Sequence, residues 1–186
     1  FNNCFLYLMP YVQAENGDVR YHYKGHFSYG YEVTQIREKV VNDLIKMTLA
    51  ISKAGKLEPG KYTCVLSPDT AGLLAHESFG HGMESDTIYK DRAKAIEYLG
   101  KRIAPDYVSI IDNPTFPMRH GSFFFDDEGM LATPTYLIKN GIVSEPITDV
   151  YSLSRLNEEG IKIRGTANAR AESFDHKCYA RMSNTY

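Results

Sequence analysis

The sequence has 186 residues, of which 43% are hydrophobic and 24% charged, and its formal net charge is −2. This length suffices for one full domain, or for a small domain and part of a second, and the composition is ordinary for a globular protein. The near-neutral charge gives no electrostatic reason to expect nucleic acid or an anionic membrane as a partner, and no apolar run is long enough to cross a bilayer.

The first sixty residues predict β-structure followed by one helix. Residues 1–32 show strand-like alternation, and Asn16-Gly17 is a strong signal for a two-residue hairpin turn. Apolar residues at steps of three and four predict a helix over residues 32–54, with Gly55 as its left-handed stop. His22 and His26 fall in the β-structure, where ordinary surface histidines are the better interpretation than metal ligands.

Residues 61–66 predict a short strand that leads into a well-capped helix. Ser67 can cap free amides of the first turn, Pro68 suits the first helical position, and Asp69 complements the positive end of the helix dipole. A capped helix after a strand would hold the residues that follow on a rigid element.

The rest of the chain predicts more helix and an antiparallel meander. Residues 86–102 have a polar helical pattern, which fits a solvated helix or a mobile segment. Strands are expected at 107–112, 122–125, 131–138 and 142–145, with turns at 127–129 and Asn140-Gly141, and a helix at 149–159. The predicted fold class is therefore α+β, with helices packed on a mixed or antiparallel sheet.

The densest chemical signal is the run His76-Glu77-Ser78-Phe79-Gly80-His81. Two imidazoles are good zinc ligands, and a glutamate beside the first can act as a base on a metal-activated water. Five helical steps, however, rotate one ring from the other by about 140°, so a regular helix cannot present both to one ion. The helix must end, kink or contain a π-turn between His76 and His81, and Gly80 and Gly82 lower the cost of such a distortion.

Other polar residues allow two interpretations each. Glu84 is the nearest candidate in the chain for a third metal ligand. The acidic run 126–128 could bind a cation, but Asp and Gly at a hairpin turn explain it better. Arg170 could clamp a peptide carboxylate or simply pair with Glu172. No role can be assigned to His120 or His176.

Several blocks, in order along nearly the whole chain, resemble the TldD/PmbA family of zinc metallopeptidases, TldD-type branch. The matching blocks are residues 74–86, 121–129, 137–142, 165–173 and 181–186. The resemblance implies that His76 and His81 bind Zn²⁺ and that Glu77 is the general base on a zinc-bound water. It also implies a third ligand, a cysteine near the C-terminus of family members, which we expect beyond residue 186. Cys178 lies in a different block and does not inherit that role.

The same resemblance implies a domain organisation, and it adds a flap over the site as a third alternative for residues 86–102, because family members insert a loop there. Residues 1–60 would be the end of an N-terminal α/β domain with its last helix. Residues 61–186 would carry the metal-motif helix and the β-meander, as the first part of a β-rich catalytic domain. A chain of this extent would be a fragment with an incomplete zinc site and weak or absent activity.

Short or unfolded peptides are the expected substrates, and a homodimer or a heterodimer with a family paralogue is the expected assembly. Neither nucleic acid nor a membrane is expected as a partner. Three widely spaced cysteines are consistent with a reducing cytoplasm. The alternatives are a catalytically incomplete scaffold or partner subunit, and a different metal hydrolase such as an amidase or deacetylase.

Overall fold

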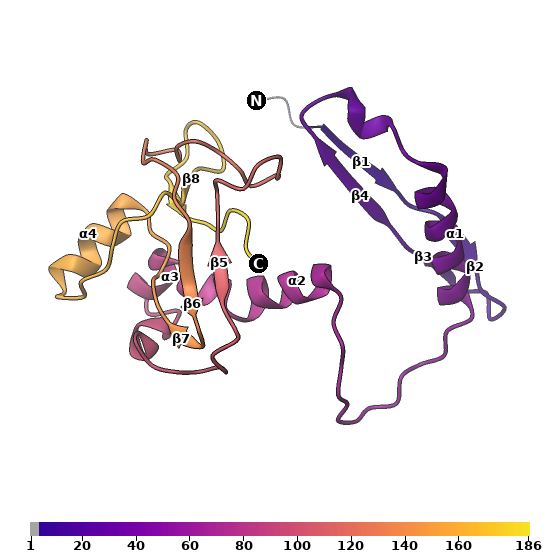
Figure 1. Cartoon of the computed structure of the whole chain (residues 1–186), viewed down its shortest axis with the longest axis horizontal. Helices are drawn as coiled ribbons and strands as arrows, with labels where there is room; N and C mark the ends of the chain where they lie inside the picture. Colours follow the sequence, from indigo (N-terminus) through magenta and orange to yellow (C-terminus); the bar gives the residue numbers. More distant parts are fainter. Residues whose placement is uncertain (1–3) are drawn as a thin grey trace. The chain divides into compact units, whose positions relative to one another are not determined.

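The computed structural model describes residues 4–186, so the first three residues of the predicted β-structure lie outside the described residues. The chain divides into two compact units, Phe1–Cys64 and Val65–Tyr186, called unit 1 and unit 2 below. Both units combine helices with small sheets whose strand pairs are all antiparallel, as Figure 1 shows, and this confirms the predicted α+β class. No helix of residues 4–186 is both long and apolar enough to cross a membrane.

Unit 1 is a long, interrupted hairpin with one helix against it. Strand β1 (Cys4–Leu8) pairs with β4 (Lys24–Ser28), and β2 (Tyr11–Gln13) pairs with β3 (Val19–Tyr21). The hairpin predicted at Asn16-Gly17 is confirmed, but its loop is longer than two residues. The amide of Ala14 donates to the carbonyl of Asp18, and Gly17 takes the left-handed conformation that closes such a loop.

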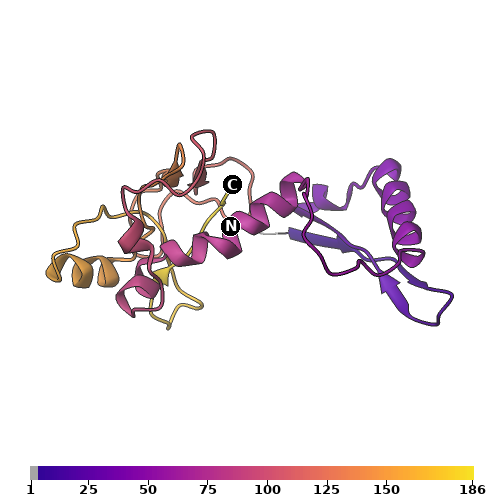
Figure 2. The same ribbon diagram turned by 90° about the horizontal axis from the view of Figure 1, so that it is seen from below.

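Helix α1 (Glu38–Ser52) runs beside this hairpin, as Figure 2 shows, and buries Leu44 and Thr48. It starts six residues later than predicted, because residues 31–34 form a separate 3-10 turn, η1 (Tyr31–Thr34). Gly55 was wrongly predicted as a left-handed stop, since its φ is not positive. Instead, the Arg20 guanidinium from β3 donates to the carbonyls of Ile51 and Ala54 at the helix end.

The strand predicted at residues 61–66 is wrong. Within residues 4–186 this segment forms no strand, and its Val65 side chain is fully exposed. A single strand gains its hydrogen bonds only from a neighbour, and none of the described strands pairs with this segment. The apolar alternation of the segment therefore has no sheet to join.

Unit 2 is built on a small antiparallel sheet of β5 (Ile110–Asp112), β6 (Thr135–Lys139) and β7 (Ile142–Val143). The turn between β6 and β7 is confirmed at Asn140-Gly141, where both residues have positive φ, as a type I′ turn requires. The strand predicted at 122–125 is wrong, because only Phe125 forms an isolated bridge, to Leu131. Phe124, Phe125 and Leu131 are all mostly exposed, so no apolar face holds a strand there.

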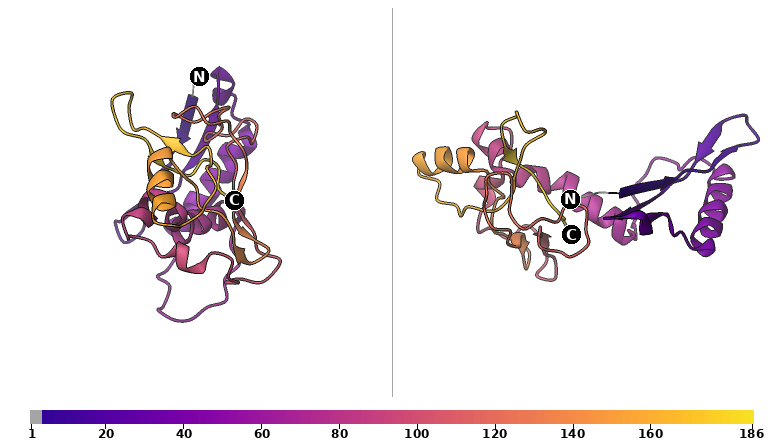
Figure 3. Two further views of the ribbon diagram at one scale, coloured as in Figure 1. Left: turned by 90° about the vertical axis from the view of Figure 1, so that its left-hand side faces the viewer. Right: turned by 90° about the horizontal axis from the view of Figure 1, so that it is seen from above.

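The remaining elements of unit 2 are short. They are α2 (Pro68–Ser78), η2 (Gly80–Met83), α3 (Ser85–Tyr89), η3 (Ala95–Tyr98), α4 (Val150–Glu158), β8 (Ala169–Arg170) and β9 (Tyr179–Ala180). The polar pattern over 86–102 thus gives two short helical pieces rather than one helix. The helix predicted at 149–159 is confirmed as α4, which lies beside α3 at the edge of unit 2, shown in orange in Figure 3.

The hydrophobic core of unit 2 packs the segment that follows His81 against the sheet. Met83, at the end of η2, is fully buried together with Leu137 of β6, Val143 of β7 and Ile147. Backbone hydrogen bonds join the same two segments. The Ser85 amide donates to the Ile147 carbonyl and the Ile147 amide donates to the Met83 carbonyl, both at 2.9 Å. The residues directly after the motif are therefore fixed by both side-chain packing and backbone hydrogen bonds.

Candidate metal centre

Helix α2 begins as its sequence predicts. The Ser67 side chain accepts a hydrogen bond from the Thr70 amide, and Pro68 occupies the first turn. The helix then runs to Ser78 and carries His76 and Glu77 in its last turn. The capped start fixes where this last turn falls, and with it the position of the first two motif residues.

The helix ends between the two histidines, as the spacing argument requires. Phe79 leaves the helical conformation with φ −134°, and η2 follows from Gly80. This break turns the chain so that the rings of His76 and His81 lie 4.8 Å apart between centroids, with their planes at 86°. A continuous helix would have separated the same rings by about 140° around its axis.

Gly80 serves this break in a way the sequence did not predict. Its φ is not positive, so conformational freedom is not its role. A methyl group at this position would overlap the side chain of Met182, which packs here from the C-terminal end of the chain. Gly82, in contrast, has no atom within 4 Å of the equivalent position. Gly80 is therefore small to admit Met182, whereas space alone would tolerate a larger residue at Gly82.

His76, Glu77 and His81 form a group that fits a metal ion. One ligand atom from each residue can be chosen so that all three lie within 4.8 Å of one another. Two imidazole nitrogens and a carboxylate oxygen are donors that zinc accepts. His76 is half-buried, while Glu77 and His81 are exposed, which leaves the position open to water and to a substrate. Among residues 4–186 this is the one such group of His, Cys, Asp and Glu side chains.

Glu84 is not a third ligand of this group but a partner of His81. Its carboxylate Oε1 lies 3.1 Å from Nδ1 of His81, whereas Nε2 of the same ring faces Glu77, at 3.9 Å from its Oε2. Burial raises the pKa of the Glu84 carboxyl, and the nearby Arg181 and His81 oppose that shift. Arg181 donates to Glu84 at 3.2 Å and to Asp86 at 3.1 Å. No local sequence pattern predicted Arg181 here, because 97 residues separate it from Glu84.

The acidic run 126–128 has a structural role in its turn. Asp126 is buried, and its carboxylate accepts hydrogen bonds from the amides of Glu128, Met130 and Ala169. This agrees with the turn interpretation and leaves little of that carboxylate for a cation. Arg170 pairs with Asp127 at 3.8 Å rather than with Glu172, so the second of its two alternatives, a pair with Glu172, is wrong. Glu172 lies against His176 instead.

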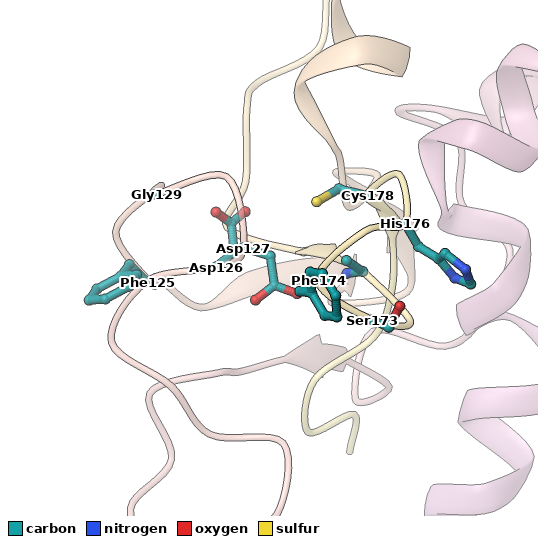
Figure 4. Close-up of a pocket in the computed structure, with 9 residues that line it drawn as sticks. Phe125, Asp126, Asp127, Gly129, Ser173, Phe174, His176 and Cys178 are labelled. Atoms are coloured by element: carbon teal, nitrogen blue, oxygen red, sulfur yellow. Dashed lines mark hydrogen bonds between the residues drawn. The ribbon is translucent and has the colours of Figure 1, made fainter.

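Cys178 lies among acidic side chains rather than among the residues of the candidate metal centre. It lines an open cavity of about 650 Å³ together with Asp126, Asp127 and His176, and Figure 4 shows its sulfur among these side chains. Burial and the surrounding carboxylates raise the pKa of the Cys178 thiol. Cys178 is not a member of the His76, Glu77 and His81 group, which is the group of the described residues that could hold a metal ion.

Comparison with known proteins places these features in a family. Residues 59–186 match the family model of the PmbA/TldA metallopeptidase C-terminal domain. A metalloprotease of Methanocaldococcus jannaschii is 32% identical over 186 residues, which cover 98% of this chain and 39% of that protein. A zinc metalloprotease TldD homolog of Saccharolobus solfataricus is 31% identical, over 94% of this chain and 39% of that protein.

Solved structures agree in fold. TldE from Thermococcus kodakarensis aligns with a TM-score of 0.68 at 15% identity, over 98% of this chain and 40% of that one. A protein from Thermotoga maritima aligns with a TM-score of 0.72 at 22% identity, over 92% of this chain and 38% of that one. This chain thus spans about two fifths of the length of the relatives that it matches.

Proposed function

The chain belongs to the PmbA/TldD metallopeptidase family, and from this premise we propose that it is the metal-binding part of a zinc-dependent peptidase. The observation that carries the proposal is the group of His76, Glu77 and His81, whose ligand atoms gather within 4.8 Å across a broken helix. A structural helix end has no need of two imidazoles and a carboxylate that face one another.

His76 and His81 would hold the zinc ion. A bound zinc supplies Lewis acidity, which lowers the pKa of a water molecule and polarises a carbonyl group. Glu77 follows His76 on the same helical turn and is exposed, so its carboxylate can accept a proton from a water placed beside the two rings. The same carboxyl can then return that proton to the departing amine of a cleaved peptide. We propose Glu77 as the general base rather than a permanent ligand.

The third protein ligand would come from outside these 186 residues. Within residues 4–186 the group holds two histidines and Glu77, and a catalytic zinc site uses three protein ligands and one open position. If Glu77 serves as the base, one ligand position remains to be filled. The isolated chain should then bind zinc weakly, and hydrolysis should require the full gene product.

Short or unfolded peptides are the proposed substrates, and a dimer with a second copy or a family paralogue is the proposed assembly. The exposure of Glu77 and His81 favours a substrate that reaches the site from solvent. A catalytically incomplete partner subunit is the second candidate, and the two-histidine composition of the group favours it. The presence of Glu77 between the ligands argues for the peptidase.

Replacement of Glu77 by glutamine in the full gene product tests the proposal. Peptide hydrolysis should fall by about 10²–10⁴-fold, because the proton acceptor is lost. Zinc content should stay at the wild-type level, since both histidines remain. Hydrolysis that survives this substitution, in protein that still holds zinc, would remove Glu77 from the base role.

A further inference from the structure

We propose that Glu84 is a positioning residue that fixes His81 with Nε2 free for the metal, and that Arg181 holds Glu84 in place. This inference rests on the proposed function, because it concerns how one of the two histidines is prepared for its ion. The observation behind it is a chain of contacts from a buried carboxylate to one particular nitrogen of the ring.

The two nitrogens of His81 face different groups. Nδ1 lies 3.1 Å from Oε1 of Glu84, and Nε2 lies on the side of Glu77. A carboxylate oxygen at this distance serves as an acceptor, so the proposed arrangement has the proton of His81 on Nδ1. The lone pair of the ring is then on Nε2, which lies 3.9 Å from Oε2 of Glu77. A carboxylate behind a ligating imidazole sets both its tautomer and its orientation.

Glu84 is well placed for this role because it is buried between two residues that are held by packing and hydrogen bonds. Its side chain is only 4% exposed. On either side of it, Met83 is fully buried and Ser85 is bonded through its amide to Ile147. His81, by comparison, is about half exposed. The buried carboxylate can therefore serve as a fixed acceptor for the more exposed ring.

Arg181 supplies the charge that a buried carboxylate needs. Its Nη1 lies 3.2 Å from Oε2 of Glu84, the oxygen that does not face His81. The same nitrogen lies 3.1 Å from Asp86, whose other oxygen accepts from Lys90 at 2.9 Å. A buried carboxylate is retained in its charged form when it is both paired and hydrogen-bonded. Arg181 thus allows Glu84 to act as an acceptor toward His81.

A purely structural ion network is the competing explanation, and Asp86 distinguishes the two. Asp86 is buried like Glu84 and shares Arg181 with it, but its carboxylate pairs with Arg181 and Lys90 rather than with His81. If the network only joined the C-terminal segment to the motif, loss of either carboxylate should have the same effect. If Glu84 positions His81, only the loss of Glu84 should change the tautomer of His81 and the affinity for metal.

The experiment compares Glu84→Gln with the matched control Asp86→Asn in the full gene product. In the metal-free wild type, long-range ¹H–¹⁵N NMR of the His81 ring should show the proton on Nδ1. That preference should be lost in Glu84→Gln and kept in Asp86→Asn. Zinc affinity, measured by competition with a chelator, should fall about 10–100-fold in Glu84→Gln and stay within about twofold in Asp86→Asn.

Three outcomes would overturn the inference. They are a wild-type His81 protonated on Nε2, an unchanged zinc affinity in Glu84→Gln, and equal losses in both variants. The wild-type NMR measurement needs no variant, so the test survives if Glu84→Gln does not fold. If the wild type bound no zinc at all, the proposed function would fail, while the tautomer of His81 would still report on Glu84.

Discussion

Asp112 offers the sharpest test of how the C-terminal segment is held against the rest of unit 2. It ends strand β5, is fully buried, and accepts four hydrogen bonds. Oδ1 accepts from the Ser183 amide at 2.7 Å and the Thr185 hydroxyl at 3.0 Å, while Oδ2 accepts from Asn168 and the Ser183 hydroxyl, both at 2.7 Å. We predict that Asp112→Asn destabilises unit 2 substantially.

The size of the expected loss in unfolding free energy follows from the groups that donate hydrogen bonds to Asp112. Each carboxylate oxygen of Asp112 faces one hydroxyl, which can rotate, and one N–H group. The Ser183 amide is a fixed donor, and the Asn168 amide could turn over only by giving up its hydrogen bond to the Arg181 carbonyl. Whichever side the new amide nitrogen takes, one N–H donor loses its acceptor, at a cost of about 1–3 kcal/mol. The other bonds lose their charge assistance, so the total is about 2–4 kcal/mol.

Calorimetry or urea unfolding would measure this loss. A loss of about 3 kcal/mol corresponds to a fall in Tm of roughly 10 °C for a unit of this size. The control is Asp106→Asn, an exposed aspartate six residues earlier, which should change the free energy of unfolding by less than about 0.5 kcal/mol. An equally small effect from Asp112→Asn would refute the claim that its four hydrogen bonds hold this segment.

Two further predictions concern close packing and thiol reactivity. Gly121→Ala should cost about 1–3 kcal/mol of unfolding free energy, because its new methyl group would overlap the backbone carbonyl of Ser183. The control is the same change at Gly82, where no atom lies within 4 Å of the new methyl group. Equal Tm values for the two variants would contradict this close packing. Cys178 should react with iodoacetamide more slowly than the exposed Cys64 near neutral pH, because its raised pKa leaves less thiolate. Mass spectrometry of the labelled protein measures both rates, and faster labelling of Cys178 would count against the effect of burial and the neighbouring carboxylates.

Sequence reasoning succeeded where the signal was local. The capped start at Ser67, the helix end before His81 and the turn at Asn140-Gly141 each depend on residues within one or two turns of chain. Such features follow from backbone sterics and nearby hydrogen bonds, which a short stretch of sequence specifies.

Sequence reasoning failed where the local structure depended on a residue distant in the chain. The strands predicted at 61–66 and 122–125 have suitable residues but no neighbouring strand in the described part of the chain. The end of α1 is held by Arg20, 31 residues away from the carbonyl of Ile51. Glu84 was considered as a metal ligand because it is near in sequence, yet its role depends on Arg181, 97 residues further on. Periodicity and spacing carry no information about such contacts.

In the proposed site, His76 and His81 hold one zinc ion, and a residue outside these 186 residues completes its coordination. Zinc stoichiometry is the decisive measurement, made on the full gene product, on the 186-residue chain, and on His76→Ala, with His22→Ala as a matched control. We predict about one zinc per chain in the full product and in His22→Ala, little in the isolated chain, and none in His76→Ala. A full gene product without zinc, or a His76→Ala variant that keeps its zinc, would contradict the proposed zinc site.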